Sequence, residues 1–160
     1  MRHTLLTWLC LSLAATGCGG TDGDAASGSG ESVLLSVDPQ AKWRALRIEG
    51  ATDLPDGAIV SYRVTHSVAN ELPPGEWPAT NLIEDGTSVV QDGVYWAELN
   101  TTYWPAGEVD VRVQFPVAPQ PDHVRGRYGN FGERLTGDNI QSLGGGSNVV
   151  VAEQTLEWTR

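Results

Sequence analysis

Histidines are the first side chains to consider for catalysis in this sequence. His66 and His123 are the two that lie beyond residue 17, and neither belongs to a nucleophile elbow or to a metal-binding pattern such as H-E-x-x-H. His66 shares one face of an alternating segment with Tyr62 and Val64, which is typical of a side chain at the edge of a core. The sequence therefore predicts no catalytic residues, no metal site and no cofactor. A hydrolase is an alternative only if the fold brings a histidine to a serine and a carboxylate.

Tryptophans are the side chains that best suit ligand binding. Trp77 lies in residues 70–78, N-E-L-P-P-G-E-W-P, where three prolines exclude a regular element, so we expect an exposed ring. Trp96 and Trp104 each follow a tyrosine, and adjacent residues of a strand point to opposite faces. Large planar rings on a surface offer a platform for sugars or an anchor for a protein partner. Trp77, Trp96 and Trp104 are therefore candidate binding residues, with core packing as the alternative for Trp96 and Trp104.

A cluster of arginines in residues 120–137 is the second candidate binding feature. Arg125, Arg127 and Arg134 occur there beside Tyr128, in a chain that is otherwise acidic. One hypothesis is a positive surface, formed by Arg125, Arg127 and Tyr128, that binds an acidic partner. The alternative is a structural segment, in which the arginines pair with nearby acids and the glycines allow tight turns.

These candidates depend on strands to position them, and the clearest strand covers residues 109–115. Its apolar side chains alternate with polar ones, which is the period of a half-buried strand. The apolar residues are Val109, Val111, Val113 and Phe115. Their burial supplies roughly 6 to 12 kcal/mol before chain entropy is subtracted, so this face requires a second sheet to cover it.

Other strand signals recur along the chain between turn-forming residues. We expect strands over residues 32–37, 43–49, 59–68, 80–84 and 148–158, and a hairpin over residues 88–99. There is no long helical pattern and no internal repeat. The sequence thus predicts an all-β fold, a two-sheet antiparallel immunoglobulin-like sandwich of about seven or eight strands with one long Gly/Pro-rich loop.

Two connections carry specific expectations. Asp92-Gly93 suits the positive φ values of a type I′ turn, which would place Val90 opposite Tyr95 in the hairpin. Residues 117–147 are rich in glycine and proline, and they predict a long loop with a helical turn near residues 121–128. A loop of this length inside a domain is either functional or a sign that an element has been missed.

The first 17 residues are predicted to be a signal peptide. Arg2 and His3 precede an apolar run over residues 5–15 that is too short to span a membrane. The next residues, Ala15-Thr16-Gly17-Cys18, resemble the lipobox of bacterial lipoproteins, whose cysteine is lipidated and becomes the first residue of the mature chain. The resemblance implies lipidation at Cys18 and favours the outer membrane, because Gly19 is not the aspartate associated with inner-membrane retention. An ordinary secreted protein cut near residue 17 is the alternative.

Composition supports the lipid anchor and divides the rest of the chain. The one other cysteine, Cys10, lies in the leader, so Cys18 has no disulfide partner in the mature chain. Residues 18–31 contain no large apolar side chain and are predicted to be a flexible tether, which leaves residues 32–160 as one β-sandwich domain. The chain carries 10 basic and 20 acidic residues, for a net charge of −10. This charge argues against nucleic acid as a partner.

Three segments resemble a loose group of uncharacterised bacterial envelope proteins. They are G-A-T-D-L-P-D-G at residues 50–57, W-P-A-G-E-V-D-V-R-V at residues 104–113, and Q-P-D-H-V-R-G-R-Y-G-N-F-G-E-R-L-T-G at residues 120–137. The resemblance implies an immunoglobulin-like or prealbumin-like β-sandwich and a place in the cell envelope. It supplies no catalytic or binding residues.

These observations lead to one functional expectation and two alternatives. We expect a lipid-anchored β-sandwich protein of the bacterial envelope that acts as a binding or structural module and is not an enzyme. Its partners would be the membrane, through the lipid on Cys18, and an envelope protein or glycan. The first alternative is a carbohydrate-binding module that uses exposed aromatic rings, and the second is an envelope hydrolase.

Replacing Cys18 with alanine tests the lipid anchor. The wild-type protein should incorporate a fatty-acid analogue supplied during growth, because the lipobox cysteine is the acylated residue, and Cys18→Ala should incorporate none. The measurement is the label on the purified protein. Equally low labelling of the two proteins would show that the lipid prediction is wrong.

Overall fold

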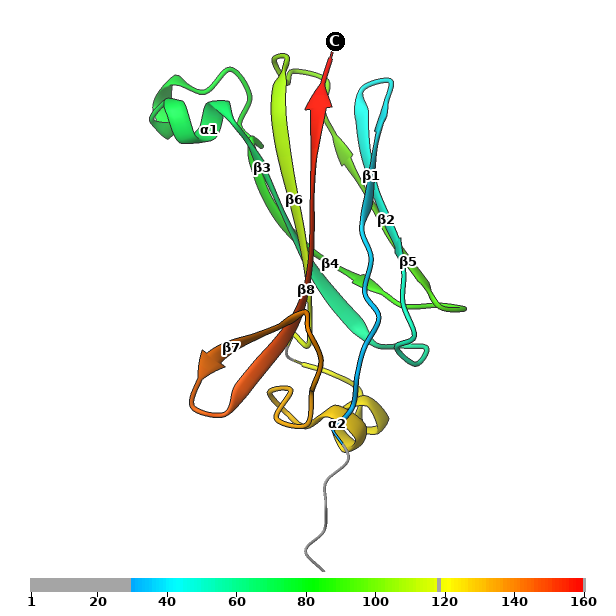
Figure 1. Cartoon of the computed structure of the whole chain (residues 1–160). Coiled ribbons are helices and arrows are strands. Elements are labelled where there is room, and N and C mark those ends of the chain that lie inside the picture. The colour runs from blue at the N-terminus through cyan, green and yellow to red at the C-terminus, as the bar shows by residue number, and fades with distance from the viewer. Residues whose placement is uncertain (1–29, 118, 160) are drawn as a thin grey trace, which may run out of the picture.

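Eight strands form two antiparallel sheets in the part of the chain that the computed structural model describes, residues 30–117 and 119–159 (Figure 1). The strands are β1 (Asp38–Lys42), β2 (Ala45–Ala51), β3 (Ile59–His66), β4 (Ile83–Val89), β5 (Val94–Asn100), β6 (Gly107–Phe115), β7 (Ile140–Gly144) and β8 (Ser147–Trp158). One sheet has the order β1-β2-β5 and the other the order β4-β3-β6-β8-β7. The predicted all-β sandwich is confirmed. The predictions for residues 1–17 and for Cys18 lie outside the described residues.

The predicted strand over residues 109–115 is the centre of the larger sheet. β6 pairs with β3 on one side and with β8 on the other. Val109, Val111, Val113 and Phe115 are all buried, with at most 1% of each side chain exposed. Burial on this scale requires the cover of a second sheet, and β2 and β5 supply it with Leu46, Ile48, Tyr95 and Leu99.

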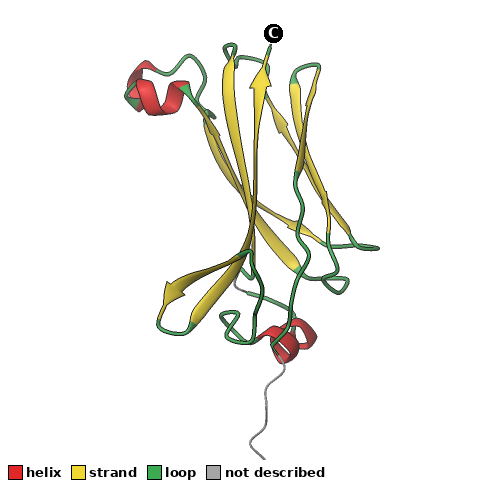
Figure 2. Ribbon diagram, viewed as in Figure 1, coloured by secondary structure: helices red, strands yellow, loops and turns green. Residues whose placement is uncertain are grey.

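Aromatic rings close the two ends of the core. At one end, the ring of Trp104 lies between those of His66 and Trp158, edge-on to both at centroid distances of 5.5 Å. At the other end, Phe115 packs edge-on against Tyr128 of α2 (Asp122–Tyr128) at 5.2 Å. Such edge-to-face pairs are a favoured aromatic geometry. Figure 2 shows α2 at the opposite end of the sandwich from the other helix, α1 (Val68–Glu71).

The predicted first strand over residues 32–37 is wrong in its position. Those residues form one isolated bridge, between Leu35 and Thr52, and the continuous ladder begins at Asp38 and runs through Pro39. A proline is tolerated there because β1 is the edge of its sheet and one side of it has no strand to bond. Trp43 and Arg44, which we expected at the start of the next strand, instead form the turn between β1 and β2, with Arg44 at φ 59°.

The hairpin predicted over residues 88–99 forms its turn but not its full pairing. Asp92 and Gly93 have φ values of 51° and 74°, as a type I′ turn requires. Beyond the turn the two arms separate, because β4 pairs with β3 while β5 pairs with β2. The backbone of Val90 bonds to Gly57 and Ala58 rather than to Tyr95. The turn therefore carries the chain from one sheet to the other.

Two segments contain more regular structure than the sequence indicated. In residues 117–147, the helical turn near residues 121–128 is confirmed as α2, but β7 was missed, and it pairs with β8 through a glycine turn at residues 144–146. In residues 70–78, α1 ends and the 3-10 helix η1 (Pro74–Glu76) follows, although we expected no regular element. Short helical turns tolerate proline at their start, which explains this difference.

The two phenylalanines of the chain offer a matched test of the core. Phe115→Ala should lower the free energy of unfolding by about 3 to 5 kcal/mol, because it leaves a cavity between β6 and α2. Phe131→Ala should change it by less than about 0.5 kcal/mol, because the Phe131 side chain is 61% exposed. Urea denaturation measures both, and equal losses would contradict the assignment of the core.

Candidate functional site

Two of the predicted binding aromatics lie in the core. Trp104 is 2% exposed and Tyr128 is 1% exposed, so neither ring is an exposed stacking platform of the kind predicted. Trp104 is buried because its ring packs between those of His66 and Trp158. Its indole Nε1 donates a hydrogen bond of 3.0 Å to Oδ1 of Asn81. The prediction that Trp104 and Tyr128 bind a ligand as exposed rings is therefore wrong.

Trp77 is less exposed than its proline-rich surroundings indicated. Its side chain is half-buried against the core, and its indole Nε1 donates a hydrogen bond of 2.9 Å to the carbonyl oxygen of Leu72. The bond joins the two ends of the segment that contains η1. Trp77 therefore holds this connection together, and little of its ring is free to stack on a ligand.

The arginines of residues 120–137 are engaged within the domain. Arg127 forms an ion pair with Glu31 at 2.8 Å, Arg125 pairs with Asp122, and Arg134 donates to the carbonyl oxygen of Gly126. The pair between Arg127 and Glu31 fastens the first described residues to α2. The geometry thus favours the structural alternative for Arg125 and Arg127 over a surface for an acidic partner.

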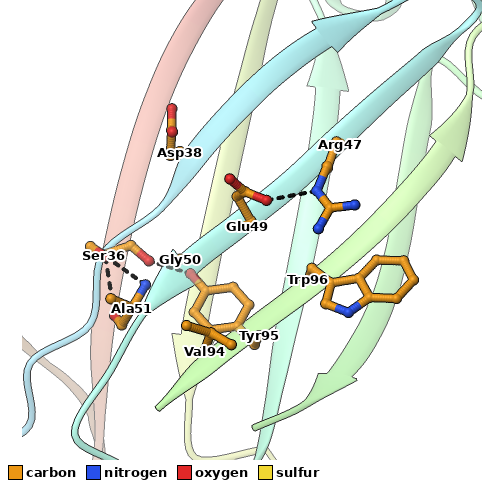
Figure 3. A pocket seen from close by; sticks show the side chains of 9 residues that line it. All are labelled: Ser36, Asp38, Arg47, Glu49, Gly50, Ala51, Val94, Tyr95 and Trp96. Carbon is orange, nitrogen blue, oxygen red and sulfur yellow. Dashed lines mark hydrogen bonds and ion pairs between the residues drawn. The ribbon is translucent and has the colours of Figure 1, made fainter. Parts of the chain in front are cut away.

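Trp96 is the predicted binding aromatic that the structure leaves exposed, at 56% of the residue's surface. It lies on the outer face of the three-stranded sheet, beside a hollow of about 360 Å³ that we call the Trp96 groove (Figure 3). The residues that line the groove are Ser36, Asp38, Arg47, Glu49, Gly50, Ala51, Val94, Tyr95 and Trp96. They come from β1, β2, β5 and the segment before β1, so the groove exists only when the three strands pair.

Polar side chains beside Trp96 are held in place by one another. Nε of Arg47 lies 2.6 Å from Oε2 of Glu49, and Nε2 of Gln40 donates to Oε1 of Glu49 at 2.9 Å. The guanidinium carbon of Arg47 also lies 5.0 Å from the centre of the Trp96 ring. Figure 3 shows the Arg47 side chain between the carboxylate and the indole. A flat ring thus stands next to a fixed, charge-balanced set of hydrogen-bond donors and acceptors.

The backbone at Trp96 is fixed by a serine from the other sheet. The hydroxyl of Ser88 donates to the carbonyl oxygen of Trp96 at 2.7 Å and accepts from its amide nitrogen at 3.2 Å. These bonds satisfy the edge of β5 that faces away from β2, where an unpaired strand would invite a neighbouring chain. Trp96 is therefore presented on a backbone held from both sides.

The floor of the groove is a close contact between β2 and the segment that precedes β1. The hydroxyl of Tyr95 donates to the carbonyl oxygen of Ser36, and Ser36 Oγ accepts from the amide of Ala51 at 2.9 Å. Gly50 permits this approach, because a Cβ atom there would lie 1.9 Å from the Ser36 oxygen. Burial raises the pKa of the Tyr95 hydroxyl above its ordinary value.

Both histidines bond to the backbone. His66 is fully buried; its Nδ1 accepts from the amide of Val68 at 3.2 Å, so Nε2 carries the proton toward the carbonyl oxygen of Pro105. Nε2 of His123 lies 3.1 Å from the carbonyl oxygen of Asp56. The hydrogen-bond partners of both rings are thus backbone groups, whereas the histidine of a hydrolase triad bonds to a serine and a carboxylate.

A metal-binding cluster and a membrane-spanning helix are both absent from residues 30–117 and 119–159. In that part of the chain no three His, Cys, Asp or Glu side chains are close enough to hold a metal ion. No helix there has the length and the apolar character needed to cross a bilayer.

Comparisons with known proteins add no relative. No protein-family model, no curated protein and no solved structure matches this chain. The resemblances at Cys18 and at residues 50–57, 104–113 and 120–137 are therefore carried by those residues alone, and the site is interpreted from its geometry.

A Tyr95→Phe variant tests the floor of the groove. At neutral pH the lost hydrogen bond should lower the free energy of unfolding by about 0.5 to 1.5 kcal/mol. The raised pKa of Tyr95 means that the folded chain holds this proton more tightly than the unfolded chain. That stabilisation is present below about pH 10 and is lost as the pH rises further, so the gap between wild type and variant should narrow above about pH 10.

Urea denaturation at two pH values measures this gap. Tyr103→Phe is the matched control, because the Tyr103 side chain is 77% exposed, and it should show no gap at either pH. A gap for Tyr95→Phe that stays constant into the alkaline range would contradict the role given to its hydroxyl.

Proposed function

We propose that this chain is a lipid-anchored binding module of the bacterial cell envelope, with the Trp96 groove as its ligand site. The observation that carries the proposal is the exposed indole of Trp96 beside the fixed pair Arg47 and Glu49. Exposed tryptophan next to arginine is typical of residues that dominate binding energy. The module acts by holding a ligand, because the groove contains no nucleophile paired with a base.

The position of the first described residues suits a tethered domain. Glu31 is bonded to Arg127 and bridges Leu135, so the chain enters the fold at the α2 end of the sandwich (Figure 1). An anchor at Cys18 would hold that end toward the membrane, and the strands would extend the rest of the domain away from it. Delivery to the outer membrane belongs to the same proposal.

An uncharged sugar is the ligand that the groove fits best. The Trp96 ring offers a flat apolar surface for the face of a pyranose, while Asp38, Arg47 and Glu49, which line the groove, offer planar hydrogen-bonding groups for hydroxyls. Arg47 and Glu49 neutralise each other, and Asp38 leaves the lining with one negative charge, which disfavours an anionic ligand. Among the alternatives considered from the sequence, this supports the carbohydrate-binding module, with Trp96 in place of Trp77 and Trp104.

A glycan array with wild type and Trp96→Ala tests this function. Wild type should bind one or more uncharged glycans, and Trp96→Ala should lose at least about tenfold in affinity, which corresponds to about 1.4 kcal/mol of stacking and desolvation. Trp43→Ala is the control, because Trp43 is 83% exposed and lies outside the groove. An array on which wild type binds no uncharged glycan would remove the sugar assignment.

A further inference from the structure

The end of the sandwich opposite α2 carries a second set of exposed aromatic and basic side chains. Trp43 is 83% exposed in the turn between β1 and β2, and Tyr103 is 77% exposed in the loop between β5 and β6. Lys42 and Arg44 flank Trp43 and are also exposed. We call these four residues the basic tip. Figure 1 shows the turn between β1 and β2 at the far end of the molecule from α2 and from the first described residues.

The two loops of the basic tip are fixed to each other and to the core. The amide of Thr101 donates to the carbonyl oxygen of Arg44 at 2.9 Å, which joins the loops directly. Oδ1 of Asn100 accepts from the amide of Thr102 at 2.9 Å and from its hydroxyl at 2.6 Å. Trp104, the residue that follows Tyr103, is buried and fixes this loop to the core. The exposed side chains are therefore presented on a braced backbone, which lowers the entropy that a ligand must overcome.

The charge of the basic tip is opposite to that of the whole chain. Lys42 is the single lysine of a sequence with net charge −10. Five ion pairs occur among the described residues, and they engage Arg47, Arg63, Arg112, Arg125 and Arg127. Lys42 and Arg44 take part in none of those five. The tip thus presents two adjacent cations that can pair with an anionic ligand.

Trp43 and Arg44 form a ridge between two hollows. The Arg44 guanidinium carbon lies 4.4 Å from the centre of the Trp43 ring. One hollow, of about 420 Å³, is lined by residues that include Thr101, Trp104 and Thr159, and the other, of about 400 Å³, by residues that include Glu98 and Asn100. Trp43, Arg44 and Thr102 line both. An extended ligand that crosses the ridge would therefore place successive units in hollows with hydroxyl and amide groups, one of which is also lined by Glu98.

We propose that the basic tip binds an acidic polysaccharide, with a sugar ring on Trp43 and a carboxylate of the polymer on Lys42 and Arg44. A repeating chain of polar rings matches a flat aromatic ridge with a polar hollow on each side, and carboxylates match the two cations. An anionic lipid surface fits less well, because it would repel the acidic body of the domain. The site is separate from the Trp96 groove, and the proposal does not depend on the function proposed for that groove.

Affinity electrophoresis of the purified chain in gels containing polygalacturonate tests the proposal. Wild type should migrate more slowly than in gels containing dextran, which has sugar rings and no carboxylates. Trp43→Ala and Arg44→Gln should each lose at least about tenfold in apparent affinity, or about 1.4 kcal/mol. Trp96→Ala is the matched control and should be retarded like wild type. All three substitutions lie at the surface, so unchanged thermal unfolding should confirm that the variants are folded.

Further arms of the experiment separate an acidic glycan from other anions. Polyglutamate carries carboxylates without sugar rings, so it should compete at least about tenfold more weakly than polygalacturonate if stacking on Trp43 contributes as proposed. Sedimentation with phosphatidylglycerol vesicles should not depend on Trp43, so wild type and Trp43→Ala should sediment to the same extent whether or not Cys18 is lipidated. Equal competition by polyglutamate, Trp43-dependent sedimentation with the vesicles, or retardation that survives Trp43→Ala would each overturn the proposal. Loss of uncharged-glycan binding in Trp96→Ala tests the Trp96 groove and has no bearing on the basic tip, so the two proposals can fail independently.

Discussion

The burial of one face of β6 is the constraint from which the rest of the architecture follows. Three valines and a phenylalanine, all at most 1% exposed, occupy that face, and their apolar surface is stabilising only if a second layer excludes water from it. The sheet of β1, β2 and β5 is that layer. The inner side chains of this three-stranded sheet are buried in the core. Its outer face and its end loops are exposed to solvent and can contact ligands.

The fold class could be predicted because it depends on local periodicity, whereas the exposure of individual rings could not. Val109 to Phe115 alternates within a single strand, so one window of sequence reveals the buried face. In Tyr95-Trp96 the same alternation says that one ring is buried, but which one depends on the register with β2, where Trp96 pairs with Glu49. Trp104 lies in a loop, where no period applies, and its burial follows from the packing of His66 and Trp158.

The Trp96 groove was beyond prediction for a related reason. Asp38, Glu49 and Trp96 meet only because β1 pairs with β2 and β2 pairs with β5. The apolar run at residues 32–37 indicates a first strand there, whereas Pro39 argues against a strand at residues 38–42, where β1 forms. The turn at Asp92 and Gly93 can be predicted from those two residues alone. That the chain changes sheets at this turn depends on the backbone bonds of Val90 to Gly57 and Ala58, which are distant in sequence.

Electrostatics explain why the smaller sheet, rather than the larger one, carries both candidate surfaces. On the outer face of the larger sheet Arg63 lies directly opposite Arg112, a like-charge arrangement that is unfavourable by itself. Asp85 bonds Arg63 through both carboxylate oxygens at 2.7 and 2.8 Å, and Glu153 pairs with Arg112. That face is thus balanced within the domain, and a ligand would have to displace existing partners. Trp96 and Trp43 are instead 56% and 83% exposed, each with an arginine guanidinium over its ring, and around Trp43 the two cations Lys42 and Arg44 outnumber the carboxylate of Glu98.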